Sequence, residues 1–147
     1  MSAKLKDEYD SDFYLWTLHN AELIRQGKFS EVDVENVAEE IESMGRSDKR
    51  QLINRLAVLI AHLLKWKFQS DRRSNSWKAT IKEQRMQTVD LLDESPSLKH
   101  ELDLKLARAY QQAVLIAMSE TGLDKKTFPA TCPFVLDECL NESFFPE

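Results

Sequence analysis

The sequence contains few of the residues that interrupt helices, with 3 Gly and 4 Pro among 147 residues. Because glycine and proline form most tight turns, their scarcity disfavours β-hairpins and favours long helices. The two cysteines, Cys132 and Cys139, are too few for a disulfide framework and are typical of a reducing compartment. The N-terminal stretch MSAKLKDEYD lacks the apolar segment of a signal peptide, and no run reaches the ~20 apolar residues that cross a bilayer. We therefore expect a cytoplasmic protein without membrane segments.

The composition is that of an ordinary globular chain, with 42% hydrophobic and 31% charged residues. This apolar fraction is too high for an intrinsically disordered protein, and the length is sufficient for one domain with its own core. The net charge of -5 argues against a protein that coats nucleic acid over its whole surface, but it leaves a local basic patch open. The sequence predicts a flexible N-terminus over residues 1–9 and a single helical domain over residues 10–147.

A central helix is predicted near residues 48–69. Twelve of the seventeen residues of Leu52–Phe68 are apolar and lie on every side of a helix, as in the buried centre of a helical protein. Capping residues and helix-ending glycines place the other helices over 10–26, 33–44, 74–92, 96–121 and 133–140. The stops are Gly27, Gly45 and Gly122, the fourth helix starts at Ser74 or Asn75, and Ser95 is the cap of the fifth. The predicted fold class is therefore all-α: a single bundle of about five main helices plus a short C-terminal helix.

The predicted helix over 33–44 is amphipathic and acidic. Its apolar residues recur at helical spacing and are expected to face the core: Val34, Val37, Ala38, Ile41 and Met44. Six carboxylates and no Lys or Arg lie between Glu31 and Glu42: Glu31, Asp33, Glu35, Glu39, Glu40 and Glu42.

A basic segment follows between His62 and Arg85. It contains seven basic residues against two carboxylates, interleaved with the aromatic residues Trp66, Phe68 and Trp77. Basic residues among aromatic rings suit phosphate contacts and base stacking. The predicted nucleic-acid or phosphate-binding residues are Arg72, Arg73, Trp77, Lys78 and Arg85. The alternative is that the acidic helix packs beside this segment and neutralises it through intramolecular ion pairs.

Arg55 and His62 form a second candidate site. Seven residues apart on one helix, they lie about two turns apart on the same side. An arginine that holds phosphate and a histidine that titrates near neutral pH are the minimum for RNA cleavage by general acid–base chemistry. The spacing resembles the active-site signature of the HEPN ribonucleases, although Leu56 stands where that family commonly has a polar residue. In the alternative interpretation, Arg55 pairs with Glu39 or Glu40, and His62 is a hydrogen-bonded core residue.

The sequence predicts no metal and no cofactor. A di-iron bundle requires a Glu three residues before its histidine ligand, and Leu59 occupies that position before His62. Cys132 and Cys139 have no second pair for a zinc site and are expected to be small buried hydrophobic residues. No glycine-rich phosphate loop, serine elbow or dinucleotide motif is present.

Several short strings, spread over nearly the whole chain from Tyr9 onward, resemble one family. They are Tyr9-Asp10 with Asp12-Phe13-Tyr14 and Trp16, Glu39-Glu40-Ile41-Glu42 with Met44-Gly45, His62-Leu63-Leu64-Lys65-Trp66, Arg72-Arg73-Ser74 with Ser76-Trp77, Gln84-Arg85, Ser95-Pro96-Ser97-Leu98, Glu120-Thr121-Gly122-Leu123, Phe128-Pro129 and Cys132-Pro133. Their order resembles that of the DUF29 family of small bacterial proteins, which are frequent in cyanobacteria. The resemblance implies an all-helical fold and no settled activity or cofactor.

The polar residues in and near these strings suggest one shared network around the central helix, formed by Glu39, Glu40, His62, Arg73, Trp77, Gln84 and Arg85. Two functional hypotheses follow. The first is a non-enzymatic interaction module that binds a protein partner or itself, through an exposed apolar patch of the tail formed by Phe128, Phe134, Phe144 and Phe145. The second is a nucleic-acid-binding or HEPN-like ribonuclease protein, in which the basic region opens into a positively charged cleft.

Overall fold

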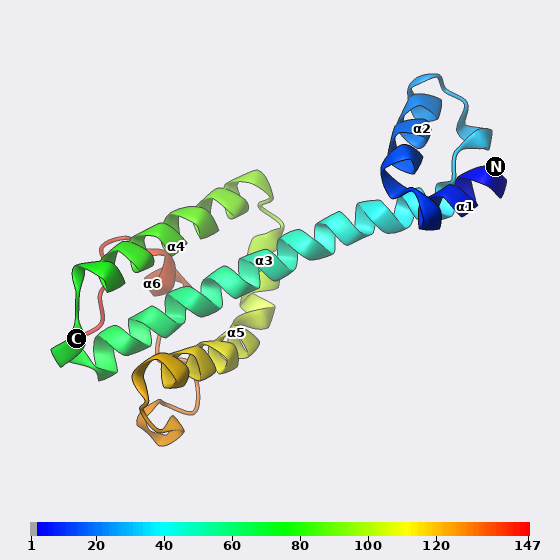
Figure 1. Ribbon diagram of the computed structural model, residues 1–147. Helices are drawn as coiled ribbons and strands as arrows, with labels where there is room; N and C mark the ends of the chain where they lie inside the picture. Colours follow the sequence, from blue (N-terminus) through cyan, green and yellow to red (C-terminus); the bar gives the residue numbers. More distant parts are fainter. Residues whose placement is uncertain (1–2) are drawn as a thin grey trace. The chain divides into compact units, whose positions relative to one another are not determined.

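The structure of this chain is a computed structural model that describes residues 3–147. Its helices are α1 (Ala3–Ser11), α2 (Phe13–Arg25), α3 (Val34–Phe68), α4 (Asn75–Glu94), α5 (Leu98–Thr121) and α6 (Leu136–Leu140), with single 3-10 turns η1 (Phe29–Glu31), η2 (Ser70–Arg72) and η3 (Lys125–Thr127) (Figure 1). No strand occurs in residues 3–147. The predicted all-α fold, with five main helices and a short C-terminal one, is confirmed.

The chain divides into two compact units, which we call the N-terminal unit (residues 3–47) and the C-terminal unit (residues 48–147). The single domain predicted over residues 10–147 stays a prediction. Residues 3–9, expected to be flexible, belong to helix α1, while Met1 and Ser2 lie outside the described residues.

The N-terminal unit is built around an aromatic cluster and a buried carboxylate. The rings of Tyr9 and Phe13 contact that of Trp16, with centroids 4.8 and 5.4 Å away. The indole Nε1 of Trp16 donates to Asp33 Oδ2 over 3.0 Å, and the Asn20 Oδ1 accepts from the backbone N–H of Asp33 over 2.9 Å. Because Asp33 immediately precedes α3, these two bonds fix the start of α3 against α2.

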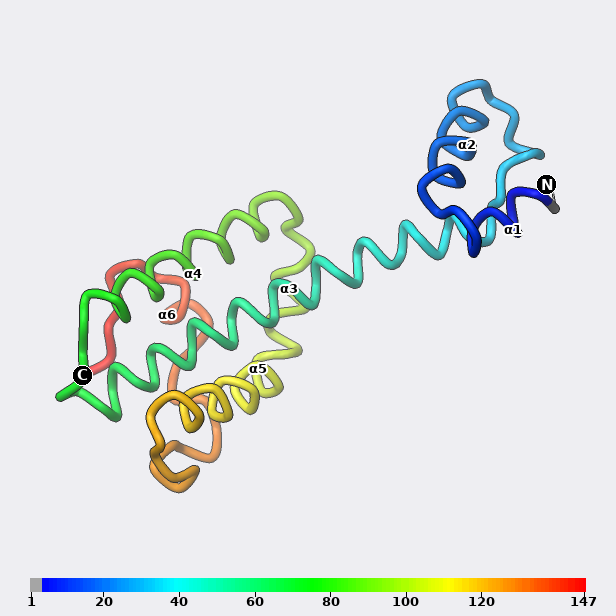
Figure 2. The backbone as a smooth tube through the Cα atoms, in the orientation of Figure 1, coloured from blue at the N-terminus to red at the C-terminus, as the bar shows by residue number. Residues whose placement is uncertain are grey.

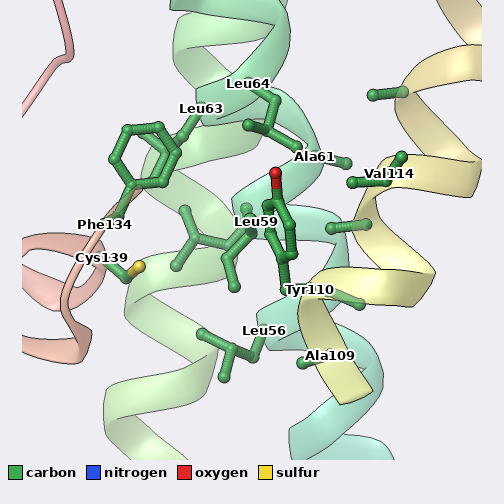
Figure 3. Packing of buried hydrophobic residues seen from close by; sticks show 14 of the residues in the cluster. Leu56, Leu59, Ala61, Leu63, Leu64, Ala109, Tyr110, Val114, Phe134 and Cys139 are labelled. Carbon is green, nitrogen blue, oxygen red and sulfur yellow. The ribbon is translucent and has the colours of Figure 1, made fainter. Parts of the chain in front are cut away.

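In the C-terminal unit, the second part of α3 is central and packs against α4 and α5 (Figure 1). Leu56, Leu59 and Leu63 of α3 are fully buried. Figure 3 shows them close to Tyr110 of α5 and to Phe134 of the segment after α5. The core confirms the central helix predicted near 48–69, which ends at Phe68.

Several predicted helix ends are confirmed, but the cap predicted at Ser95 is wrong, because Ser95 follows α4 and α5 begins at Leu98 after Ser97. Ser74 caps α4, since its hydroxyl accepts from the backbone N–H of Trp77 over 3.2 Å. Gly27 and Gly122 have φ values of 73° and 75°, in the left-handed region that glycine adopts without steric cost, and they follow α2 and α5.

The predicted helix end at Gly45 is wrong. Gly45 lies inside α3, and only Gly27 and Gly122 have positive φ among the described residues. A glycine inside a helix costs about 1 kcal/mol relative to alanine. Ending the helix would instead leave four carbonyls and four N–H groups without helical partners, so continuing it is the cheaper solution. The helices predicted over 33–44 and 48–69 are therefore one helix, α3. The additional helix α1 comes from residues 3–11, most of which were predicted to be flexible.

The inner face of α4 includes polar residues. In α4, Val89 is exposed, and Arg85 and Thr88 are the buried residues of its inner face together with Ile81. In the first part of α3, four of the five residues expected in the core are exposed, and Val37 is half-buried.

Candidate functional site

The exposed apolar residues of this chain are concentrated in the N-terminal unit. Nine of the fourteen large hydrophobic residues exposed among those described lie there: Phe13, Tyr14, Leu15, Leu18, Ile24, Phe29, Val34, Ile41 and Met44. The last three belong to the apolar face of the helix over 33–44 that the sequence predicts to face the core. Their exposed fractions are 59%, 59% and 63%. Since an α-helix repeats every 3.6 residues, positions 34, 41 and 44 share one side of α3. We call these three residues the α3 stripe.

The part of α3 that carries the α3 stripe is acidic. From Val34 to Ser47, α3 carries four carboxylates and one arginine, a net charge of -3. Arg46 donates to Glu39 over 2.6 Å and lies 3.7 Å from Glu42, so one cation serves two carboxylates. Glu40 accepts a hydrogen bond from the Tyr9 hydroxyl, and this bond raises the Tyr9 pKa to about 12. The pairing of Arg55 with Glu39 or Glu40 stays a prediction, because Arg55 belongs to the other unit.

The four phenylalanines of the tail, which were expected to form an exposed patch that binds a partner, are not exposed. Phe128 and Phe134 are buried, and Phe144 and Phe145 are half-buried against the core. Their rings pack in pairs, Phe68 with Phe128, Phe134 with Phe144, and Trp66 with Phe145. The four phenylalanines therefore belong to the core of the C-terminal unit or pack against it.

The side chain of Arg85 holds the tail by donating hydrogen bonds to backbone carbonyl groups of the tail. Its side chain is 3% exposed and donates to four carbonyl oxygens of residues 138–144: Nε to Cys139 (2.7 Å), Nη2 to Phe144 (2.6 Å) and Glu138 (3.4 Å), and Nη1 to Glu142 (3.5 Å). Burial lowers the pKa of the guanidinium, which nevertheless stays protonated in proteins. The planar fork of arginine suits this task because its five N–H groups diverge toward several acceptors.

Arg73 makes a similar contact at the end of the chain. Its Nε donates to the Trp66 carbonyl over 2.8 Å, its Nη2 donates to the Pro146 carbonyl over 3.3 Å, and its guanidinium lies 4.9 Å from the Trp66 ring centroid. Figure 2 shows the C-terminal end of the backbone beside the turn between α3 and α4. Arg73 and Arg85, both predicted to bind phosphate, thus bind the C-terminal segment.

The other predicted phosphate-binding residues have varied surroundings. Arg72 is exposed, and Trp77 is half-buried under Lys65, whose Nζ lies 4.7 Å from the ring centroid and 2.8 Å from Glu120. Lys78 is exposed, with Nζ 5.6 Å from the Phe145 centroid. The phosphate-binding role of Arg72, Trp77 and Lys78 stays a prediction.

Arg55 and His62 lie on α3 within the C-terminal unit. His62 is only 9% exposed, and burial lowers its pKa. Its Nδ1 lies 3.0 Å from the Val58 carbonyl, an acceptor, so Nδ1 carries the proton and Nε2 is the basic nitrogen. Arg55 is half-buried, and its Nε has no hydrogen-bond partner within residues 3–147. The ribonuclease roles of this pair stay a prediction.

The predicted polar network spans both units. Glu39 and Glu40 have the partners given above, in the N-terminal unit. Gln84 belongs to the C-terminal unit, where its Oε1 is buried and makes no hydrogen bond with any described residue. A single network that joins these three residues with His62, Arg73, Trp77 and Arg85 stays a prediction.

The cysteines are free thiols. Cys139 is fully buried, and burial raises its pKa to about 12, while Cys132 is half-buried and donates to the Phe134 carbonyl over 3.3 Å. Residues 3–147 contain no group of three His, Cys, Asp or Glu side chains placed to hold a metal ion. None of the described helices is long and apolar enough to cross a membrane.

Sequence reasoning missed two features. The first is the Trp16–Asp33 bond, because its two residues are 17 positions apart and no local pattern links them. The second is the contact of Arg85 with the tail, because its acceptors are backbone carbonyls, which leave no side-chain signal. The only hint is the position of Arg85, four residues after Ile81 on the inner face of α4.

Comparison with known proteins identifies the family. The model of DUF29, a domain of unknown function, matches residues 8–145 of the 147-residue chain. No curated protein and no solved structure matches this chain. The matched range contains the α3 stripe, Arg85, Arg73 and the phenylalanines of the tail. Since the match extends over nearly the entire sequence, the chain belongs to the DUF29 family.

Proposed function

We propose that this chain is a non-enzymatic interaction module whose N-terminal unit binds an α-helix of a partner protein through the α3 stripe. We place it in the cytoplasm, because its two cysteines are free thiols, as expected in a reducing compartment. The observation that carries the proposal is the exposure of Val34, Ile41 and Met44, which have the spacing of a buried helix face.

Exposed apolar side chains scattered singly are normal, but a stripe on one side of a helix is typical of an interaction surface. Burying the rest of Val34, Ile41 and Met44 contributes roughly 3 to 5 kcal/mol, since full burial of such a side chain is worth about 1.5 to 3 kcal/mol. A partner helix with apolar residues at i, i+3 or i+4, and i+7 matches this stripe in length and spacing.

The net charge of this part of α3 favours a basic partner. Glu35, Glu39 and Glu42 are exposed on the same part of α3, where the net charge is -3. A second copy of this chain would bring an equally acidic helix against it, and like charges across an interface are unfavourable. A helix whose apolar face is bordered by Lys or Arg meets the same surface with opposite charge. The partner we propose is therefore a basic amphipathic helix.

Two synthetic helical peptides test this proposal. Both carry the same Leu and Ile stripe, and one has Lys along its borders where the other has Glu. Fluorescence anisotropy with the full chain is expected to show binding of the Lys peptide only. The double variant Ile41→Glu, Met44→Glu is expected to weaken that binding at least tenfold, about 1.4 kcal/mol.

The matched control is Leu104→Glu, an equally exposed leucine of α5 in the C-terminal unit. It should bind the Lys peptide like the unchanged chain, and circular dichroism should give the same helix content for all variants. Equal binding of both peptides, or binding that survives the double variant, would contradict the proposal. A dimer in solution that Ile41→Glu dissociates would identify a second copy as the occupant instead.

A further inference from the structure

A cavity of about 420 Å³ lies between α4 and the C-terminal segment of residues 141–147. Lys78, Lys82 and Arg85 line it from α4, and Glu142, Ser143 and Phe145 line it from the C-terminal segment. It belongs wholly to the C-terminal unit and shares no residue with the α3 stripe. Its size falls in the range of small-molecule sites, which measure about 300 to 1,000 Å³.

The charges that line the cavity are unbalanced. Three cations face one carboxylate, and the ion pairs found across residues 3–147 include none made by Lys78, Lys82 or Arg85. Lys78 and Lys82 are one turn apart on α4, an arrangement in which like charges repel. A cavity with this lining therefore has a positive electrostatic potential, which attracts an anion.

Arg85 is a buried cation of this lining. All four of its hydrogen bonds go to neutral carbonyls, so its charge is solvated by dipoles but not paired with a carboxylate. A buried charge is costly unless it is paired. Its Nη1 has the weakest contact, 3.5 Å to the Glu142 carbonyl, and so retains donor capacity. Nη1 is the group expected to reach an anion in the cavity.

Phe145 orders the cations around the cavity. Its ring centroid lies 5.6 Å from Lys78 Nζ and 5.4 Å from the Arg85 guanidinium carbon, distances typical of cation–π contacts. The aromatic ring thus limits the positions of two of the three cations without neutralising either. Lys82 has an exposed side chain that is free to turn toward a bound group.

We propose that this cavity binds the phosphate group of a small phosphomonoester. A phosphomonoester carries close to two negative charges at neutral pH, which balances three cations and one carboxylate. Lysine binds phosphate as a point charge, and arginine binds it through its planar N–H groups. The cavity is larger than a bare phosphate ion, so an attached organic group of sugar size fits beside it.

Ligand binding by the full chain tests the proposal, with ribose 5-phosphate, ribose and inorganic phosphate as probes. In a two-dimensional amide NMR spectrum, ribose 5-phosphate should shift the resonances of Ser143 and of the α4 residues around Lys82, and ribose should shift none. Inorganic phosphate should cause the same shifts more weakly, and added salt should weaken both. The double variant Lys78→Met, Lys82→Met should lose at least tenfold in affinity for ribose 5-phosphate.

Arg72→Met is the matched control, because Arg72 is an exposed cation outside the cavity. It should bind ribose 5-phosphate with unchanged affinity. Absence of amide shifts up to roughly 10 mM ligand, or affinity unchanged in the double lysine variant, would overturn the proposal. A short single-stranded RNA that binds where ribose 5-phosphate does not, and that requires Arg72, would also overturn it in favour of a nucleic-acid surface. None of these outcomes depends on the α3 stripe.

Discussion

Replacing Arg85 with methionine removes the guanidinium that holds the tail while keeping an apolar stem of similar reach. Two of its bonds are short, 2.7 Å to the Cys139 carbonyl and 2.6 Å to the Phe144 carbonyl, and the other two are long and contribute little. A hydrogen bond to a charged group is worth about 1.5 to 3 kcal/mol, so the two short bonds supply roughly 3 to 6 kcal/mol. Part of this returns, because the buried cation no longer has to be desolvated. We expect Arg85→Met to lower the free energy of unfolding by about 2 to 4 kcal/mol.

Urea denaturation monitored by tryptophan fluorescence measures this loss. Trp66 and Trp77 report on the C-terminal unit, and the Trp66 ring packs 5.0 Å from Phe145 of the tail. Lys82→Met is the control, since it removes an exposed charge from the same helix, and we expect a change within about 0.5 kcal/mol. Arg85→Lys should be nearly as destabilising as Arg85→Met, because an ammonium cannot reproduce the fork. A loss below about 0.5 kcal/mol for Arg85→Met would refute the assignment of Arg85 as the tail anchor.

Three further predictions concern buried or bonded polar groups. Because burial lowers the His62 pKa in the folded chain, the unfolded chain binds protons more readily, and stability should fall as pH drops below the unfolded value of about 6.5 and continue falling until it passes the lowered folded pKa. His62→Asn, whose amide N–H can replace the Nδ1 donor, should remove this pH dependence in urea titrations. Glu40→Gln should bring the Tyr9 pKa down from about 12 toward 10.0, as measured by absorbance of the phenolate. Asp33→Ala should leave the Trp16 indole without its acceptor, lower the stability of the N-terminal unit by about 1 to 3 kcal/mol, and speed amide hydrogen exchange in α1 and α2.

Each of these predictions has a matched control. His100→Asn changes an exposed histidine and should leave the pH dependence of stability as it is in the unchanged chain. Glu39→Gln, whose carboxylate pairs with Arg46 rather than Tyr9, should move the Tyr9 pKa less than Glu40→Gln does. Asp12→Ala removes an exposed cap and should cost less than Asp33→Ala. Equal effects of a variant and its control would contradict the corresponding assignment.

The sequence by itself determined the helical class, the central helix and several helix ends. These features depend on local patterns: the scarcity of glycine and proline, the apolar run Leu52–Phe68, the cap at Ser74, and the glycines at positions 27 and 122. Each acts through neighbours along the chain, so it can be recognised without knowing the fold. Gly45 is the exception because the same residue type either ends a helix or is tolerated within it.

The tertiary structure alone decided which side chains of the candidate sites are covered. The stripe of Val34, Ile41 and Met44 has the spacing of a core face, and its exposure depends on which elements pack against it. Likewise, a basic segment among aromatic residues is equally compatible with phosphate binding and with contacts to the chain itself. Arg73 and Arg85 bind backbone carbonyls of residues 138–146, acceptors that every residue type possesses. Because such partners are identical along the sequence, only the fold could select them.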